Sequence, residues 1–117
     1  MQLFLVDGGR ARAVERFDSR FSIAHLVRTS EGIQVTFAYL QKDGSIGRHE
    51  AVENQILVVV DGEGWVGGAD GTQKPIGVGQ AAFWTKGEQH ETGSESGLTA
   101  IILEGAGVKP PPNAVPV

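Results

Sequence analysis

Glycine recurs at short intervals along this chain and divides it into apolar segments that are too short for most helices. There are 17 glycines among 117 residues, and few stretches show the apolar spacing of an amphipathic helix. Short apolar segments joined by glycine-containing turns are typical of β-sandwiches and β-barrels. We therefore expect many short strands and little helix. The expected strands are Phe21 to Val27, Ile33 to Tyr39, Ile56 to Val60, Phe83 to Trp84 and Leu98 to Leu103.

Two of these segments also indicate how their strands are buried. Between Ile33 and Tyr39 large apolar residues occupy alternate positions, which predicts a strand with this apolar face toward a core. The run Ile56 to Val60 is apolar throughout and rich in β-branched residues, as expected for a strand covered on both faces. Asp61-Gly62 is expected to end this strand. Residues 67–71 are expected to form a hairpin tip, because their glycines and aspartate tolerate the backbone angles of tight turns.

Composition excludes several classes of protein. The chain has no cysteine, which excludes disulfide scaffolds, thiolate zinc sites and cysteine nucleophiles. The net charge of −4 does not fit a nucleic-acid-binding surface. The apolar run Leu3 to Val6 is too short for a secretory signal, and no stretch reaches the ~18 apolar residues of a membrane helix. We therefore expect one cytoplasmic domain that binds neither nucleic acid nor membrane.

Two short motifs match known sites but lack the context that those sites need. Gly62, Gly64 and Gly67 have the spacing of the dinucleotide fingerprint, which requires a helix opening at the third glycine. The glycines and the proline that follow break any such helix. The segment His49 to Glu53 reads H-E-x-x-E, one ligand short of the zinc-protease motif, and the glycines and valines around it favour a strand. We assign neither function.

Two segments, Gly44 to Gly62 and Gly79 to Ser94, each combine a histidine with spaced glycines. Their spacing resembles the paired motifs of the cupin family. The first segment has His49, Ala51, Gln55 and Gly62 where cupins usually carry His, His, Glu and Gly. The second segment has Gly79, Thr85, Gly87, His90 and Ser94 where cupins usually carry Gly, Pro, Gly, His and Asn.

This resemblance implies an all-β fold, the cupin-type double-stranded β-helix or jelly-roll barrel, as a single domain over residues 1–107. Residues 108–117 hold four of the five prolines and are expected to form a C-terminal tail outside the sheet. Small cupins commonly pair, so the resemblance also implies a homodimer, with Gln2 to Val6 as a candidate contact segment.

The resemblance further implies a site for a divalent transition metal ion. In this chain Ala51 removes one imidazole and Gln55 replaces a carboxylate by an amide, so the remaining metal ligands are His49, Gln55 and His90. We expect this set to hold Ni, Zn, Fe or Mn only weakly. Two alternatives stay open. The three residues form a hydrogen-bonded polar network without metal, or the histidines bind an anionic small molecule.

Other residues are candidates for contact with a small-molecule ligand. His25, the third histidine, is a candidate substitute for the missing imidazole or a substrate contact. Tyr39, Phe83 and Trp84 are assigned to substrate binding, because ligand pockets are mostly apolar with few polar anchors. Two functions follow as hypotheses: a metal-dependent small-molecule enzyme of the dioxygenase or isomerase type, and a metal-free module that binds a small metabolite. The fold cannot choose between them, because function depends on the site.

Overall fold

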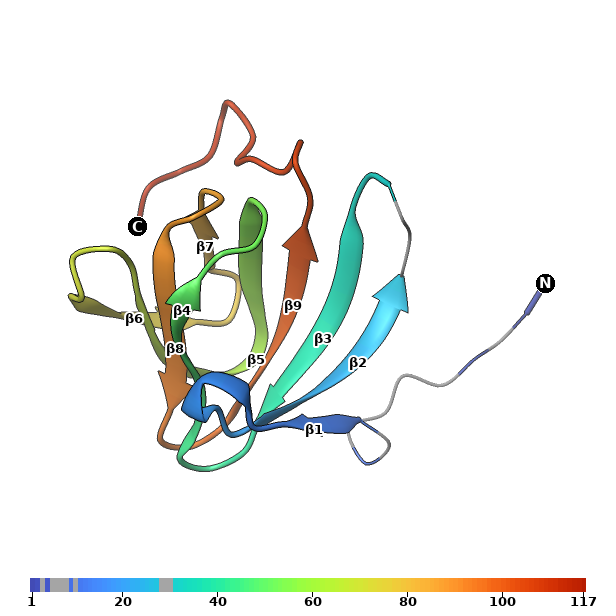
Figure 1. Ribbon diagram of the computed structural model, residues 1–117, viewed down its shortest axis with the longest axis vertical. Coiled ribbons are helices and arrows are strands. Elements are labelled where there is room, and N and C mark those ends of the chain that lie inside the picture. Colours follow the sequence, from blue (N-terminus) through green and yellow to red (C-terminus); the bar gives the residue numbers. More distant parts are fainter. Residues whose placement is uncertain (3, 5–8, 10, 28–30) are drawn as a thin grey trace.

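The computed structural model describes residues 1, 2, 4, 9, 11–27 and 31–117, and most of the regular structure in this part is β-strand (Figure 1). The all-β prediction is confirmed. The elements in chain order are β1 (Arg12–Val14), the 3-10 turn η2 (Arg16–Asp18), β2 (Phe21–Val27), β3 (Gln34–Leu40), β4 (Gly44–Glu50), β5 (Gln55–Gly67), β6 (Gln73–Gly77), β7 (Ala81–Trp84), β8 (Gln89–Ser94) and β9 (Leu98–Glu104).

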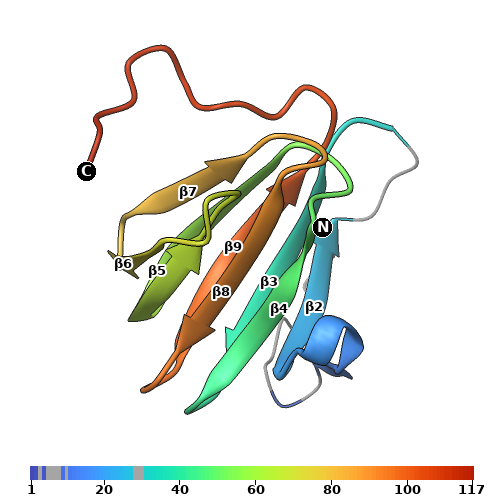
Figure 2. The same ribbon diagram turned by 60° about the vertical axis from the view of Figure 1, so that its left-hand side comes forward.

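The described strands form one nine-stranded antiparallel sheet that curls into a half-barrel (Figures 1 and 2). Its order is β1-β2-β3-β9-β5-β8-β4, and β6 and β7 each pair with β5. The first part of β5 pairs with β7 and β9, whereas its last part pairs with β6 and β8. β5 therefore belongs to two layers. We call β2-β3-β9-β5-β7 the first layer and β4-β8-β5-β6 the second layer.

β5 continues through Asp61-Gly62, so the expectation that the strand ends there is wrong. Its register against β9 shifts between Val59 and Asp61, and Gly62 has a φ of 77°. Glycine adopts this left-handed conformation without steric cost. A Cβ at residue 62 would also overlap the carbonyl oxygen of Gly97. The chain bends at this point and passes from the first layer to the second.

The inner face of the curled sheet forms the core. Along the first part of β5, to Val59, and along β9, to Ile102, every second residue points inward and is buried, which is the period of two expected for strands. The largest fully buried side chains are Leu57, Val59 and Thr92.

β3 presents the opposite face to the core from the one predicted. Its buried residues are the inward-facing Thr36, Ala38 and Leu40, whereas Phe37 and Tyr39 point outward and stay partly exposed. A period of two is compatible with either orientation, and the curl of the whole sheet selects between them. Ala38 pairs with Ala100 of β9, and both residues are fully buried, so small side chains fill the interior at this level.

The other strand positions and the hairpin tip agree with the structure, whereas the run Ile56 to Val60, expected to be covered on both faces, is buried on its inner face only and leaves Val60 exposed. Strands β2, β7 and β9 cover the predicted segments, and Gly67 pairs with Gln73 across the predicted hairpin tip. The first residue of the predicted tail packs with the domain, because Val108 is buried and its carbonyl accepts a hydrogen bond from Nδ2 of Asn54 at 3.1 Å. Residues 109–117 are exposed.

No helix in the described part of the chain is long and apolar enough to cross a membrane. Of the segment Gln2 to Val6, which was expected to contact a second copy, residues 3, 5 and 6 lie outside the described residues.

Replacing Gly62 by alanine should destabilise the protein far more than the same change at Gly71. Both residues have nearly the same φ, 77° and 76°, so both variants carry the left-handed strain of about 1–2 kcal/mol. Only Gly62 lies against another backbone segment, and nothing lies within 4 Å of a Cβ at Gly71. Chemical denaturation should show a loss above about 3 kcal/mol for Gly62→Ala. Equal losses in the two variants would contradict the close approach of β5 to Gly97.

Candidate functional site

His49 and His90, the two histidines of the predicted metal set, lie side by side on neighbouring strands. His49 is on β4 and His90 is on β8, and the two residues are directly paired in the register of these strands. Their ring centroids are 4.4 Å apart, and the ring planes are inclined by 51°. Residues paired in this way project from the same face of a sheet, which here is the inner face. The structure thus brings the two imidazoles together.

His49 is held in one orientation by contacts on two sides. Its Nδ1 donates a hydrogen bond to the carbonyl oxygen of Gly47 at 2.7 Å. This bond fixes the tautomer in which Nε2 carries a free lone pair, as the outer hydrogen bond does in metal-binding histidines. Phe17 stacks on the imidazole with ring centroids 4.3 Å apart and 3° between the planes. His49 therefore offers one oriented acceptor nitrogen.

The turn that carries Phe17 is strained and fits closely against β4. Phe17 and Asp18 have φ values of 57° and 59°, a region that costs a residue with a Cβ roughly 1–2 kcal/mol. A Cβ at Gly47 would overlap the carbonyl oxygen of Phe17, and the Gly47 N–H donates to Oγ of Ser19 at 2.8 Å. The Arg16 guanidinium lies 5.0 Å from the Phe17 ring centre. Sequence reasoning missed Phe17, because no local pattern connects it to His49.

His90 is buried and has an unpaired nitrogen. The residue is 3 % exposed, and its Nε2 has no hydrogen-bond partner among the described residues. Burial, and to a smaller extent the neighbouring His49, lower the pKa of His90 from 6.5 to about 4. The indole of Trp84 packs against the imidazole at a centroid distance of 4.8 Å. His90 is therefore neutral at neutral pH, and its unpaired nitrogen, which costs about 1–3 kcal/mol, indicates a place for water, an ion or a ligand.

Ala51 and Gln55 occupy the two positions where cupins usually carry His and Glu. Of the two, only Gln55 has a polar side chain. Gln55 is 7 % exposed and pairs with Trp84 in the register of β5 and β7, so its side chain is on the inner face. Ala51 is 3 % exposed and belongs to the apolar core. Within the described part of the chain, no group of three His, Asp or Glu side chains converges to hold a metal ion. The available donors are two imidazoles and one amide.

A carboxylate that sequence reasoning overlooked lies in the same row of the sheet as Gln55. Glu104, the last residue of β9, pairs with Gln55 and is partly exposed, so it projects from the same face. Leu98, Ala100 and Ile102 of this strand are buried on that face. Continuing the alternation by two residues beyond Ile102 would have identified Glu104.

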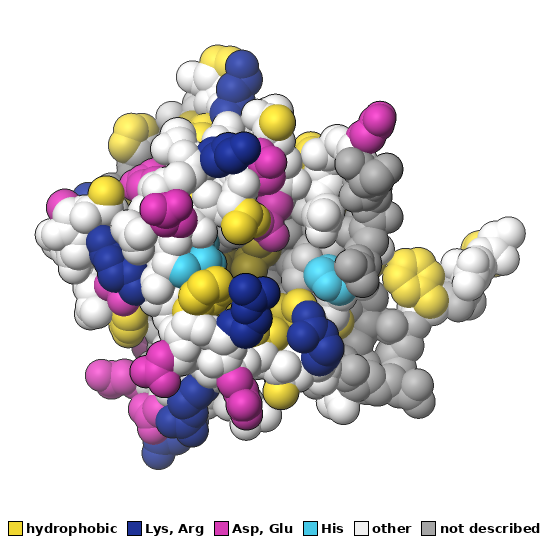
Figure 3. Space-filling model, in the orientation of Figure 1, with side chains coloured by type: hydrophobic (Ala, Val, Ile, Leu, Met, Phe, Trp, Pro, Cys, Tyr) yellow, Lys and Arg dark blue, Asp and Glu magenta, His cyan; other side chains and the backbone are white. Residues whose placement is uncertain are grey.

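Of the other four residues predicted to contact a ligand, Trp84 lies against the histidine pair, whereas His25, Tyr39 and Phe83 do not. His25 is exposed on β2, its Nδ1 is hydrogen-bonded to Oγ1 of Thr36 at 3.0 Å, and three strands separate β2 from β8. Figure 3 shows histidine at two separate places on one face, with a hydrophobic hollow between them. Tyr39 and Phe83 project from the outer face of the first layer, because they alternate with buried neighbours. Trp84 projects inward and contacts His90.

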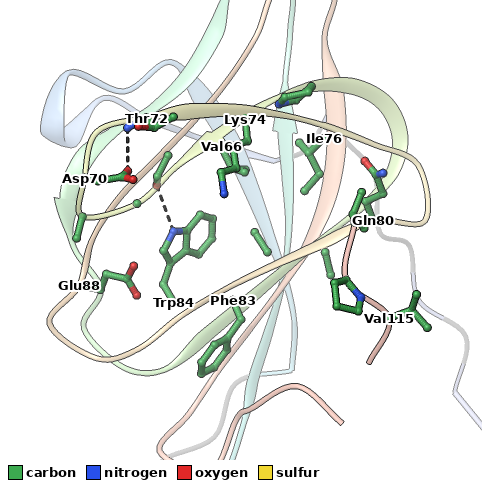
Figure 4. Close-up of a pocket in the computed structure, with 18 residues that line it drawn as sticks. Val66, Asp70, Thr72, Lys74, Ile76, Gln80, Phe83, Trp84, Glu88 and Val115 are labelled. Atoms are coloured by element: carbon green, nitrogen blue, oxygen red, sulfur yellow. Dashed lines mark hydrogen bonds between the residues drawn. The ribbon is translucent and has the colours of Figure 1, made fainter. Parts of the chain in front are cut away.

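Trp84 also lines a hollow of about 850 Å³ between β6 and β7 (Figure 4). Val66, Ile76 and Phe83 supply further apolar lining, and Val115 of the tail lies at its edge. The indole Nε1 of Trp84 donates a hydrogen bond to the carbonyl oxygen of Gly67 at 3.1 Å, which fixes the ring. Neither His49 nor His90 lines this hollow. It is therefore a space separate from the histidine pair, and Trp84 is common to both.

The two rings of the histidine pair lie close together, with their centroids 4.4 Å apart. Neutral imidazole nitrogens can serve as ligands for a transition metal ion or as hydrogen-bond partners for a small molecule. Both rings have a nitrogen available, and the amide oxygen of Gln55 is a weaker third donor. The set carries no negative charge, so it fits a weakly held ion better than a tightly held one.

Comparison with known proteins gives matches by structure but none by sequence. No protein-family model and no curated protein sequence matches the chain. The structure is similar to a cupin 2 conserved barrel domain protein from Salinispora arenicola CNS-205, with a TM-score of 0.72 at 15 % identity, over 90 % of this chain and 88 % of the other. It is also similar to a predicted oxalate decarboxylase from Thermotoga maritima, with a TM-score of 0.70 at 21 % identity, over 86 % and 96 % of the two chains.

A third similar structure is the DMSP lyase DddQ from Ruegeria pomeroyi DSS-3. The TM-score is 0.69 at 16 % identity, and the match covers 92 % of this chain but 57 % of the lyase. At these identities the similarity establishes the fold and leaves the activity to the residues of the site.

The burial of His90 predicts a loss of stability in mild acid. The unfolded chain takes up a proton at His90 as the pH falls below about 6.5, whereas the folded chain does so only near pH 4. Stability is therefore lost as the pH falls through this interval, by about 3 kcal/mol for a pKa lowered from 6.5 to about 4. Guanidinium denaturation at pH 7 and pH 4, with chelator present, should show a smaller loss for His90→Gln than for the wild type.

The matched control for this prediction is Thr92→Val, which changes a buried side chain of the same strand and removes no titratable group. This variant should keep the pH dependence of the wild type. If His90→Gln loses as much stability between pH 7 and pH 4 as the wild type does, His90 does not titrate as a buried group.

Proposed function

Since the chain has the cupin fold, we propose that His49, His90 and Gln55 bind a divalent transition metal ion weakly, and that a small molecule completes its coordination. One observation carries this proposal. The imidazole of His49, whose Nδ1 is fixed by the carbonyl of Gly47, packs at a centroid distance of 4.4 Å against the imidazole of His90, whose buried Nε2 is unpaired among the described residues. Imidazole is a good ligand for Zn, Fe and Ni, whereas Mn prefers oxygen ligands such as the amide oxygen of Gln55.

The charge of the donors indicates which small molecule suits the site. Two neutral imidazoles and an amide contribute no negative charge, so a divalent ion held by them keeps its full charge. An anionic oxygen ligand such as a carboxylate would compensate that charge, and Ala51 supplies no ligand that would compete with it. Phe17 and Trp84 cover His49 and His90 respectively and keep water away from parts of both rings.

This proposal makes the protein a metal-dependent enzyme that acts on a small molecule, of the dioxygenase or isomerase type. When bound, the ion would act as a Lewis acid on an oxygen of the ligand. His49 and His90 would hold the ion, and Gln55 would bind the ion or orient the ligand. The names of two similar structures, a DMSP lyase and a predicted oxalate decarboxylase, support small-molecule chemistry on this fold.

A second candidate function is metal-free binding of a small metabolite. It is favoured by the replacement of two ligand positions by Ala51 and Gln55, and by the absence, within the described residues, of any group of three His, Asp or Glu side chains that could hold a metal ion. In this case a polar group of the metabolite forms a hydrogen bond with Nε2 of His90. This bond removes the free-energy cost of burying that nitrogen without a partner. The two candidates use the same residues and differ in what contacts this nitrogen.

Metal binding should depend on His49 and His90 and be independent of His25. Protein purified without a nickel column, stripped with chelator and titrated with Zn, Mn, Fe or Ni, should bind about one ion per chain. His49→Ala and His90→Ala should each weaken this binding by at least about 100-fold, because each removes a direct ligand. His25→Ala, a matched loss of one histidine outside the pair, should leave it unchanged. Isothermal titration calorimetry and elemental analysis measure these outcomes.

Two results would overturn the metal proposal. Binding that is lost equally in His25→Ala would place the ion elsewhere. No binding of any of the four metals, together with metabolites that raise the melting temperature of the wild type but not of His90→Ala, would establish the metal-free candidate, because a ligand stabilises the state to which it binds.

Restoring the two altered ligands should strengthen the site. Ala51→His combined with Gln55→Glu adds an imidazole and a negative charge, so the metal affinity should rise by at least about tenfold over the wild type. Gln55→Glu alone should give part of this gain and avoids placing a larger side chain at the buried Ala51. Unchanged affinity in both folded variants would show that residues 51 and 55 do not point toward the histidine pair.

A further inference from the structure

The hollow between β6 and β7 is large enough to hold a small molecule and is separate from the histidine pair. Its volume of about 850 Å³ lies in the range of ligand pockets, about 300–1,000 Å³. Val66 and Ile76 line it from β5 and β6, and Phe83 and Trp84 line it from β7 (Figure 4). These four side chains give the hollow apolar walls, as is usual for small-molecule sites.

The tail adds apolar groups at the edge of this hollow, and the core supplies apolar groups on its inner side. Val115 and Val117 are among the lining residues and are 85 % and 95 % exposed. Ile76 and Trp84, by contrast, are buried members of the core. An apolar group bound here would rest on the core and would also remove surface of the two valines from water, which is favourable.

Lys74 brings a positive charge to these apolar walls. It pairs with Val66 in the register of β6 and β5 and is two residues from the buried Ile76, so both β6 side chains leave the same face of the strand. Figure 4 shows the Lys74 side chain directed into the hollow. Its ammonium group has no ion pair or hydrogen bond within the part of the chain that the structure describes.

The two carboxylates that line the hollow are bonded to neighbouring backbone groups. Oδ1 of Asp70 accepts a hydrogen bond from the N–H of Thr72 at 2.9 Å. Oε1 of Glu88 accepts one from the N–H of Thr85 at 3.1 Å. Among the described residues that line the hollow, Lys74 is therefore the charged group without a partner in the chain.

We infer that this hollow binds a small monocarboxylic acid with an apolar body, whose carboxylate pairs with Lys74 and whose body packs on Val66 and Trp84. An ion pair beside apolar walls is stronger than one in open water, because less water screens it. A neutral apolar molecule would leave the ammonium group unpaired, and a cationic one would be repelled by it. The inference does not depend on the proposed metal site, because neither His49 nor His90 lines the hollow.

The experiment titrates the protein with octanoate and with 3-phenylpropionate and follows the indole N–H of Trp84 by nuclear magnetic resonance. This group donates to the carbonyl of Gly67, another lining residue, so its signal reports on the hollow. The chain has two tryptophans, and Trp84→Phe assigns the signal. Chelator is present, so that no metal ion offers a second site. Saturable shifts with either acid support the inference, and their comparison shows whether an aliphatic or an aromatic body is preferred.

Variants of Lys74 separate the charge from the apolar walls. Lys74→Gln should weaken binding of the acids by at least about tenfold, because it removes a charge-assisted hydrogen bond. Lys74→Arg keeps the charge and should bind within about threefold of the wild type. Lys86→Gln removes an exposed lysine that does not line the hollow and should have no effect. The uncharged 1-octanol should bind to the wild type and to Lys74→Gln alike.

Three results would overturn the inference. The first is an unchanged Trp84 signal with both acids at millimolar concentrations. The second is equal weakening in Lys74→Gln and Lys86→Gln, which would assign the effect to net charge. The third is loss of binding in His49→Ala, which leaves the lining of the hollow unchanged and would place the acid at the histidine pair. Circular dichroism should confirm that each variant is folded.

Discussion

The passage of β5 from one layer to the other is the constraint on which the rest of the structure depends. The first part of this strand pairs with β7 and β9, and its last part pairs with β6 and β8. The bend at Gly62 makes this possible, because it uses a backbone conformation and a close approach that only glycine accommodates. Through this one strand, Gln55 in the first layer and His90 in the second share the same inner face.

His90 departs from the usual rule that buried polar groups are hydrogen-bonded. Ser94 follows the rule on the same strand, since its hydroxyl accepts from the N–H of Gly97 at 2.8 Å and donates to the carbonyl of Glu63. Nε2 of His90 has no such partner in the described chain, and burial keeps the ring neutral. The same packing that costs stability leaves a nitrogen lone pair or N–H available to a ligand. Metal binding and metabolite binding are two ways of using it.

The outward-facing residues of the two layers differ in polarity, although both layers follow the same period of two. In the second layer the outward positions carry Arg48 and Glu91, which pair with each other in water. In the first layer the outward positions carry the apolar Phe37 and Ile101, which form neither ion pairs nor hydrogen bonds with water. Both layers share the inner core, so burial of the core does not explain the difference.

The sequence by itself determined the all-β class, the positions of β2, β3, β7 and β9, the start of β5 and the hairpin tip, because alternation and turn residues are local properties. The resemblance of the two histidine segments to the paired cupin motifs also made His49 and His90 candidates for one site. The sequence did not determine that Phe37 and Tyr39 point outward, since a period of two fits either face and the curl of the whole sheet decides between them. Nor did it place Phe17 on His49. That contact needs a strained turn packed against Gly47, and such a fit between distant segments exists only in the tertiary structure.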